Sequence, residues 1–146
     1  MEKIHIIARS VILSKGSILL AHHKDFFFLP GGHVKWGESI ENALKRELKE
    51  ELGIEANVNG FIGIMECVWD NKGTPFQELN FVFNVSGHGL SSNTPVNSKE
   101  SHIAFVWQNF KNLDQIKFTP IRIYEFLKKC ESVHKPIFFS TITDNK

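Results

Sequence analysis

One segment in the first half of the chain places acidic residues at helical spacing, GHVKWGESIENALKRELKEELGI. Ser39 is a good N-terminal cap and Gly53 a good C-terminal one, so we expect a helix of about four turns between them. Such a helix must bury its apolar stripe and still leave its carboxylates accessible. This double demand constrains the fold more than any other feature of the sequence.

At about 100° per residue, the expected helix has three faces. The carboxylate face holds Glu47, Glu50 and Glu51 beside Ile40 and Ala43, the apolar stripe holds Leu44, Leu48 and Leu52, and the outward side holds Asn42, Lys45 and Lys49. Arg46 precedes Glu50 by four residues, close enough for the guanidinium to hold that carboxylate. Arg46 is therefore interpreted as a positioning residue.

The crowding of Glu47, Glu50 and Glu51 needs an explanation, because like charges at this spacing repel one another. One alternative is a solvated face of good helix formers with i,i+4 pairs. The clustering on one side and the glycine-bracketed loop before the helix favour a metal site instead. Glutamates without a cysteine or histidine partner suit Mg²⁺, and also Mn²⁺.

The full spacing of this segment resembles the signature of the Nudix hydrolases. Its fixed positions are Gly32, Glu38, Arg46-Glu47-Leu48, Glu50-Glu51 and Gly53-Ile54. The resemblance implies cleavage of a nucleoside diphosphate linked to another moiety, with Mg²⁺ as the cofactor and Mn²⁺ as a substitute. Charge developing on the phosphate oxygens and an in-line water both require such a metal.

The resemblance also implies roles for individual residues. Glu47, Glu50 and Glu51 contact the metal, Glu38 orients the group that deprotonates the water, and Gly32 lets the preceding loop fold over the helix. The water is deprotonated by one of these glutamates or by an acid further along the chain. Which one acts as the base stays open at this point, as does the number of metal ions.

A further metal ligand is expected from a loop downstream of the helix. Glu100, just before the apolar run 103–107, is the candidate, and Glu66 and Glu78 are its rivals. Glu66 alternates with apolar neighbours and would face the cleft from a strand. The alternative for Glu100 is an ordinary solvated loop acid.

Six residues are expected to contact the substrate, and they are Gly31, Gly32, Trp36, His23, Lys24 and Phe28. Trp36 lies inside the loop before the helix, where an aromatic ring can stack on a base. Phe28 belongs to an aromatic run, 26–28, that also suits a buried strand. For His23 and Lys24 the alternative is plain surface solvation.

The segments FFFLPGGHVKWGE and FQELNFVF resemble small bacterial Nudix proteins grouped with ADP-ribose pyrophosphatases and oxidised-nucleotide triphosphatases. We place hydrolysis of a nucleoside triphosphate, normal or oxidised, to a nucleoside monophosphate and pyrophosphate first. Cleavage of ADP-ribose or a sugar nucleotide comes second. A nucleotide-ligand sensor without catalysis, and processing of RNA 5′ ends, are the alternatives from other classes.

The composition of the chain limits the kinds of binding partner that we expect. With 17 basic and 16 acidic residues, the chain has no charge excess to attract a nucleic-acid backbone or a membrane, so a small nucleotide is expected. Neither a leader peptide nor an apolar span of membrane length is evident. Cys67 and Cys130 have no metal-ligand spacing and are expected as free thiols in the cytoplasm. The resemblance adds the expectation of a homodimer.

The rest of the chain reads as strands around this helix. We expect strands over 4–13, 17–22, 26–29, 55–69 with a break at Gly60, 76–85, 103–108 and 137–142, a loop over 87–99, and a second helix over 120–130. At 146 residues the chain is expected to form one domain, 1–146. The fold class is α/β, the Nudix fold, an α/β/α sandwich with a mixed sheet.

Overall fold

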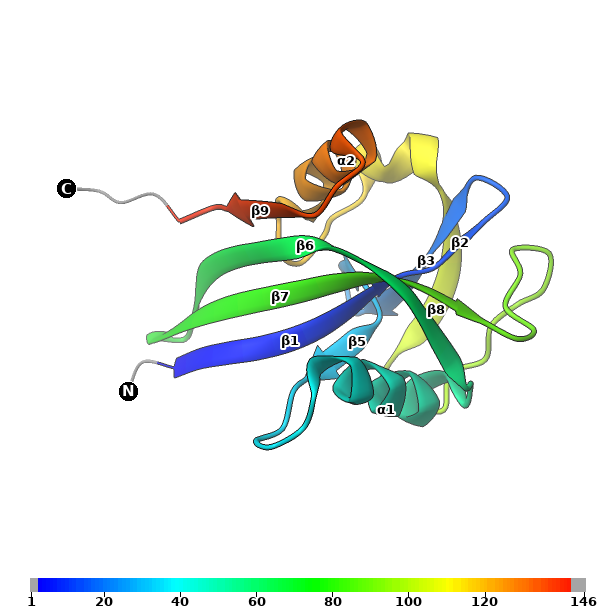
Figure 1. Ribbon diagram of the computed structural model, residues 1–146, viewed down its shortest axis with the longest axis horizontal. Coiled ribbons are helices and arrows are strands. Elements are labelled where there is room, and N and C mark those ends of the chain that lie inside the picture. Colours follow the sequence, from blue (N-terminus) through cyan, green and yellow to red (C-terminus); the bar gives the residue numbers. More distant parts are fainter. Residues whose placement is uncertain (1–2, 143–146) are drawn as a thin grey trace.

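The computed structural model describes residues 3–142 and places two β-sheets between two α-helices, as Figure 1 shows. Long strands make up most of the larger sheet, and the two helices lie on opposite sides of it. This arrangement confirms the expected α/β sandwich with a mixed sheet.

The larger sheet has the strand order β5-β1-β7-β6-β9. Its members are β1 (Lys3–Val11), β5 (Gly31–His33), β6 (Ala56–Asn71), β7 (Thr74–Gly87) and β9 (Ile137–Ser140). The pairs β1–β7 and β6–β9 are parallel, whereas β1–β5 and β6–β7 are antiparallel. The tight turn at Lys72 and Gly73, both with positive φ, joins β6 to β7.

The smaller sheet is antiparallel and is centred on β3. Its strands are β2 (Leu13–Ser14), β3 (Ser17–His23), β4 (Phe26–Phe28) and β8 (Ala104–Asn109), and a 3₁₀ helix, η1 (Phe110–Gln115), follows β8. Leu19, Leu20 and Ala21 of β3 are fully buried, as expected for a central strand that is covered on both faces.

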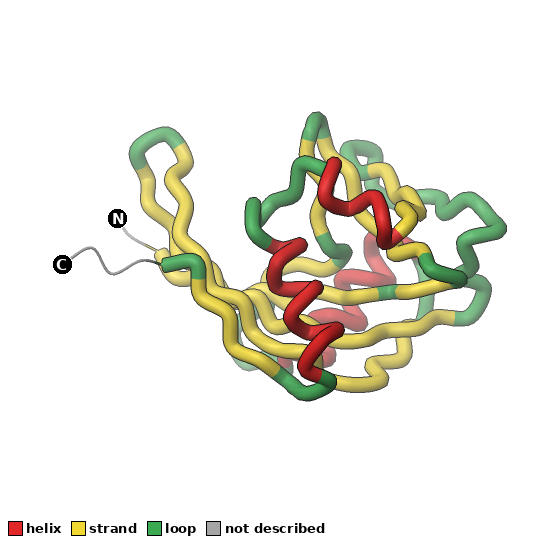
Figure 2. Tube along the Cα trace, turned by 90° about the horizontal axis from the view of Figure 1, so that it is seen from above, coloured by secondary structure: helices red, strands yellow, loops and turns green. Residues whose placement is uncertain are grey.

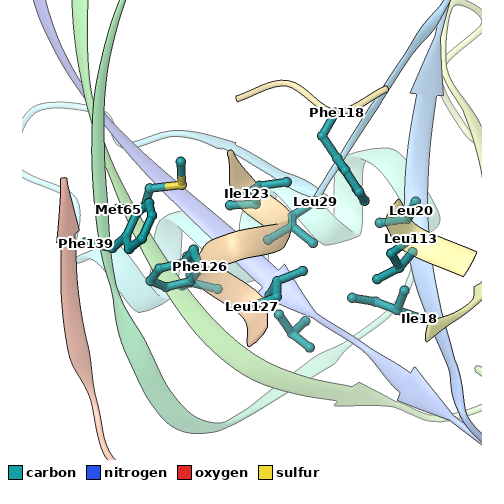
Figure 3. Close-up of a cluster of buried hydrophobic side chains, with 12 residues drawn as sticks. Ile18, Leu20, Leu29, Met65, Leu113, Phe118, Ile123, Phe126, Leu127 and Phe139 are labelled. Carbon is teal, nitrogen blue, oxygen red and sulfur yellow. The ribbon is translucent and has the colours of Figure 1, made fainter. Parts of the chain in front are cut away.

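Helix α1 (Ile40–Leu52) packs its leucine stripe against one side of the larger sheet. Leu44, Leu48 and Leu52 meet Ala8 of β1 and Phe83 of β7 in one apolar cluster. Helix α2 (Ile123–Val133) packs on the opposite side. A second cluster of buried apolar side chains lies beneath α2. Figure 3 shows Phe126 and Leu127 of α2 in this cluster, together with Met65 and Phe139.

Three differences from the sequence-based expectation are found, and the first two arise from pairing between distant strands. The glycines 31–32, expected in a loop, form β5 because β1 supplies an antiparallel partner. Strand β6 does not break at Gly60 but continues through bulges against β7. The second helix begins at Ile123 rather than at Pro120.

The larger sheet is longer than the helices that cover it. Figure 1 shows α1 beneath one end of the sheet, and Figure 2 shows the β6–β7 hairpin extending beyond both helices. The chain therefore offers two different sheet surfaces, one packed under a helix and one beyond it.

Both cysteines are free, Cys67 buried in β6 and Cys130 half-buried in α2, as expected. Over residues 3–142, none of the helices combines the length and apolar character needed to cross a bilayer.

Candidate metal and substrate site

Helix α1 is fixed at both ends by the caps that the sequence predicts. The Ser39 hydroxyl accepts a hydrogen bond from the backbone N–H of Asn42 at 3.2 Å. Gly53 adopts a left-handed conformation with φ of 70°, and its N–H donates to the carbonyl of Lys49. The register of the carboxylate face is therefore set by local sequence.

Arg46 lies at the centre of the acidic cluster. Its guanidinium donates two hydrogen bonds to the carboxylate of Glu38, at 2.8 and 3.0 Å, and one to Glu47 at 2.9 Å. It also donates to the carbonyl of His33 at 3.0 Å and reaches Glu50 at 3.4 Å. The expected contact with Glu50 is present, but the bidentate contact with Glu38 is the shorter one.

Glu38 is the main hydrogen-bond partner of Arg46. The Arg46 guanidinium, together with the Lys35 backbone N–H, lowers the pKa of Glu38 to about 2. The hydrogen bonds to Glu38 and then Glu47 raise the pKa of Arg46. Glu38 thus stays ionised and anchors Arg46, which in turn holds Glu47. The role expected for Glu38, orienting the catalytic base directly, stays a prediction.

Glu51 is the anomalous carboxylate of the cluster. Its side chain is 6% exposed, and its Oε2 is buried without a hydrogen-bond partner in the described chain. Burial, then the nearby charge of Glu47, raises the pKa of Glu51 to about 8, with Arg9 opposing and Glu100 adding to the rise. A buried oxygen without a partner is costly, and a bound cation removes that cost.

The two glycines before the helix make room for the carboxylates. A Cβ on Gly32 would lie 2.4 Å from the Cδ of Glu47, so any larger residue would displace that side chain. Gly31 has φ of 146°, and a Cβ there would collide with the Ala8 carbonyl oxygen at 2.0 Å. Strand β5 can therefore lie close to both β1 and α1 only with glycine at these positions.

Glu100 lies near the buried carboxylate. Its charge contributes to the raised pKa of Glu51, and the N–H of its neighbour Lys99 donates to the Glu51 carbonyl at 2.7 Å. Of the rivals, Glu66 lies in β6, and Glu78 of β7 accepts a hydrogen bond from Trp69 and is separated from Glu51 by Arg9. Of the three candidates, the fold brings Glu100 toward Glu51.

The donor set fits an oxygen-preferring cation that keeps most of its water. Glu47, Glu50, Glu51 and Glu100 supply only carboxylate oxygens, which Mg²⁺ and Mn²⁺ accept. Within residues 3–142, no three acidic, histidine or cysteine side chains form a closed metal cluster. Glu47 is turned toward Arg46 and half of the Glu50 side chain is exposed. Such an open arrangement suits an ion bound by one or two carboxylates, water and substrate phosphate.

The six residues expected at the substrate are not all brought together. His23 accepts from or donates to the carbonyl of His102 at 2.7 Å, which ties the β3–β4 turn to the segment that follows Glu100. Lys24 occupies that same turn. Phe28 lies beneath Arg9, with the guanidinium carbon 5.7 Å from its ring centroid. Trp36 is fully exposed, in the loop between β5 and α1.

Sequence reasoning named Glu78 only as a rival metal ligand and missed Arg9 and Asn80, which form with it a polar row across the larger sheet. Arg9 of β1 donates to Asn80 Oδ1 of β7 at 3.3 Å and to the Leu29 carbonyl at 3.0 Å. Glu78, two residues before Asn80, is 8% exposed and accepts from Trp69 Nε1 at 2.5 Å. The signal was present in the sequence, because Arg9 directly follows the apolar run 6–8 within the predicted strand.

Burial lowers the pKa of Arg9, and the charges of Glu78 and then Glu51 oppose that shift. Arg9 therefore stands between two acids, the buried carboxylate of α1 and that of β7. It links the candidate metal site to the partly exposed ring of Trp69, which stacks on Phe76 with centroids 4.6 Å apart.

Comparisons with known proteins identify a family and several similar proteins. A protein-family model described as the NUDIX domain matches residues 4–130. An ADP-ribose pyrophosphatase from Methanocaldococcus jannaschii is 46% identical over 41 residues, which cover 28% of this chain and 24% of that protein. The phosphatase NudJ of Escherichia coli K12 is 30% identical over 102 residues, which cover 67% of this chain and 65% of NudJ. The matches thus span less than two thirds of these relatives' length.

Solved structures share the fold. The E. coli ORF135 protein superimposes with a TM-score of 0.67 and 25% identity, covering 90% of this chain and 91% of that one. A MutT protein from Methanosarcina mazei gives a TM-score of 0.71 at 21% identity, covering 92% and 97%. An ADP-ribose pyrophosphatase from Streptococcus suis gives 0.64 at 17% identity, covering 93% and 98%.

Proposed function

This chain belongs to the Nudix family, and we propose that it hydrolyses a phosphoanhydride bond of a nucleoside diphosphate linked to another moiety. The observation that carries the proposal is Glu51. A carboxylate oxygen buried without a partner, beside Glu47 and with a raised pKa, is unfavourable in the protein alone and favourable next to a divalent cation.

Glu47, Glu50, Glu51 and Glu100 would hold Mg²⁺, for which Mn²⁺ substitutes. When bound, the ion neutralises charge on the phosphate oxygens and lowers the pKa of a coordinated water. Arg46 keeps Glu47 aligned through its 2.9 Å contact, and Glu38 fixes Arg46. Gly32 leaves the space that the Glu47 carboxylate occupies against β5.

We propose that the polar row contacts the nucleotide. Arg9 keeps donor capacity beyond its bonds to Asn80 and Leu29, and a guanidinium suits a phosphate oxygen. Glu78 accepts donors, and Trp69, 43% exposed, provides an aromatic surface for a base. Beside them, Gly31, Phe28, His23 and Lys24 stay proposed substrate contacts.

We place a nucleoside triphosphate first as the substrate, with a nucleoside monophosphate and pyrophosphate as products. The fold shared with a protein named MutT is compatible with this order but carries no substrate information at 21% identity. The second candidate is ADP-ribose or a sugar nucleotide, which the 46% identity to a protein named ADP-ribose pyrophosphatase favours over a short stretch.

A small-molecule substrate in the cytoplasm completes the proposal. The nearly balanced charge, 17 basic against 16 acidic residues, provides little attraction for a polymer backbone. Two free thiols suit a reducing compartment.

A panel assay tests the function. Release of phosphate and pyrophosphate is measured with Mg²⁺ on normal and oxidised nucleoside triphosphates, ADP-ribose, sugar nucleotides and dinucleotides, with Glu51→Gln as the inactive control. Turnover of one class that disappears with EDTA and in Glu51→Gln supports the proposal. Tight binding of one compound with no turnover of any would instead support the sensor alternative.

The catalytic base is found by the same assay on single Glu→Gln variants at positions 47, 50, 51 and 100. A variant that loses kcat at saturating Mg²⁺ while its apparent Mg²⁺ affinity is unchanged identifies the base. Variants that lose Mg²⁺ affinity and recover kcat at higher Mg²⁺ identify ligands.

A further inference from the structure

A cavity of about 670 Å³ lies on the α2 side of the larger sheet, where the chain passes from β1 into β2. Its walls are formed by residues of β1, β6, β7 and α2, by the β2–β3 turn and by the start of η1. Pockets that bind small molecules usually enclose about 300–1,000 Å³. The cavity is therefore large enough for a small-molecule ligand.

This cavity is separate from the candidate metal and substrate site. Within residues 3–142, its lining includes none of the glutamates of that site, no member of the polar row and no proposed substrate contact. Arg9 and Val11 point to the same side of β1. Arg9 turns toward Asn80 and Leu29, whereas Val11 lines the cavity. The cavity therefore begins beyond the polar row, at the end of β1.

The floor of the cavity is a row of the larger sheet that no element covers. Val11 of β1 pairs with Asn84 of β7, which pairs with Gly60 of β6. A Cβ added to Gly60 would meet no atom within 4 Å, so the sheet presents open space there. Asn84 is exposed, although Asn80 and Val82 on the same side of β7 are fully buried. The cover over this side of the sheet therefore ends at the row of Asn84.

The walls are held by contacts between distant segments. The Phe110 N–H donates to the Gly16 carbonyl at 3.0 Å, which joins the start of η1 to the β2–β3 turn. The Cys130 thiol donates to the Ile62 carbonyl at 3.9 Å, which joins α2 to β6. These contacts form without a ligand, so the cavity is preformed, as ligand pockets usually are.

The lining combines an apolar interior with basic residues at its border. Its apolar members are Val11, Leu13, Ile62, Phe110 and Leu127. Lys15 and Lys111 also line the cavity, with one acid, Glu131. All three charged residues are exposed, and none forms an ion pair with another of the residues 3–142. A lysine packs its stem along apolar surface and keeps its amine in water, so both amines remain available to a ligand.

A smaller hollow of about 300 Å³ extends the cavity and shares Ile62, Asn84 and Cys130 with it. It adds two basic residues, His134 and Lys135, and its lining within residues 3–142 contains no acid. Basic residues therefore outnumber acids along the whole groove. A cleft with one prevailing sign of charge attracts ligands of the opposite sign.

We propose that this cavity binds a small amphipathic anion, with its apolar body on the floor and its charged group beside the amines of Lys15 and Lys111. Burial of the apolar body supplies most of the affinity, because the interior of the cavity is apolar. The lysines supply the preference for an anion. A cationic molecule with the same apolar body meets the same floor but is repelled by both amines.

The reactivity of Cys130 tests this proposal on the full chain, because Cys130 lines the cavity whereas Cys67 is buried in β6. The rate of modification by a neutral maleimide is measured with increasing decanoate, decanol or decylamine, which share an apolar body and differ in charge. Cys130→Ser identifies the signal. Decanoate is expected to slow modification at saturation, with a dissociation constant at least ~10-fold below that of decylamine.

Charge variants locate the preference for an anion. Lys15→Glu combined with Lys111→Glu is expected to raise the dissociation constant of decanoate at least ~10-fold and to leave that of decanol within about twofold. Lys117→Glu combined with Lys128→Glu is the matched control, since it makes the same charge change at two exposed residues outside the cavity. Asn84→Trp fills the floor and is expected to abolish protection by both compounds.

Protection of Cys130 by decanoate that is lost in the Lys15 and Lys111 double variant, and kept in the control, supports the proposal. Absence of protection by decanoate in the wild type would overturn it, as would equal protection by decanoate and decylamine. Far-UV circular dichroism checks that each variant is folded, and the comparison of the three compounds on the wild type requires no variant. None of these measurements depends on whether a nucleotide is hydrolysed.

Discussion

The two helices cover opposite sides of one sheet but differ in what they bury. Helix α1 is capped by Ser39 and Gly53 and buries a carboxylate, Glu51, together with its leucines. Helix α2 has no side-chain cap at Arg122 and buries only Ile123, Phe126 and Leu127. Its acid near the start, Glu125, is about half exposed and paired with Arg122 at 2.7 Å.

The buried groups of α2 therefore contribute to stability alone, whereas α1 also carries the candidate functional site. Every buried group of α2 contributes apolar contact, whereas α1 carries a group that is unfavourable unless something outside the protein compensates for it. The defined caps of α1 hold that group in a fixed register. A helix built only for stability would carry neither the buried glutamate nor the crowded acids.

The largest expected effect comes from matched substitutions of one acid in each helix. We expect Glu51→Gln to lower kcat/KM on the preferred nucleotide by about 1000-fold or more, because the loss removes charge from the metal site. Glu125→Gln, far from that site, is expected to stay within about twofold of the wild type. Equal losses in both variants would contradict the assignment of α1 as the functional helix.

Removing apolar contact from α2 is the next largest effect. Phe126 is fully buried and packs edge-to-face on Phe139. Phe126→Ala is expected to lower the free energy of unfolding by about 4 kcal/mol in urea denaturation. The apparent Mg²⁺ affinity of the remaining folded protein is expected to be unchanged. A selective loss of Mg²⁺ affinity would show that α2 contributes to the site.

The buried carboxylate gives a pH dependence to the metal-free protein. The pKa of Glu51 is about 8 in the folded chain against 4.5 as its ordinary value, so the folded state holds the proton more tightly. The contribution of Glu51 to stability is therefore fully present below pH 4.5 and is lost as the pH rises through 8.

Between pH 5 and pH 8 in EDTA, we expect this group to lower the free energy of unfolding by roughly 3 kcal/mol. Glu51→Gln lacks the titration, so the difference between the two urea-denaturation curves isolates it from other groups. A difference that stays constant over this pH range would contradict the raised pKa.

The smallest expected effect compares the helix starts. Ser39→Ala removes the hydrogen bond to the Asn42 N–H and is expected to cost about 1 kcal/mol in thermal or urea unfolding. Arg122→Ala, which removes no cap, is expected to cost less, within about 0.5 kcal/mol. A larger loss in Arg122→Ala would show that its contact with Phe139 outweighs the cap.

Much of the candidate site follows from short-range sequence. The caps, the leucine stripe and the Arg46–Glu47 and Arg46–Glu50 contacts all lie within a few residues of one another, so helical spacing sets them. Strand positions were likewise predictable from runs of apolar residues, apart from β5 and from β2, whose Leu13 was expected as the end of one strand over 4–13. Strand β5 has no side-chain pattern, because two of its three residues are glycines.

The remaining features depend on contacts between distant segments. The burial of Glu51, its approach to Glu100 and the polar row of Arg9, Asn80 and Glu78 join residues that the sequence separates by dozens of positions. The same holds for exposed apolar strand residues such as Val68 and Phe138, which look like ordinary strand residues until the extent of the covering helices is known.

The sequence by itself determined the family resemblance, helix α1 and the acids that a metal would need, since these are set by spacing along one helix. The tertiary structure decided which of those acids is buried without a partner, which downstream acid approaches it, and which sheet surface stays uncovered. Burial and electrostatic environment arise only when separate strands and helices pack together, and no local pattern encodes them.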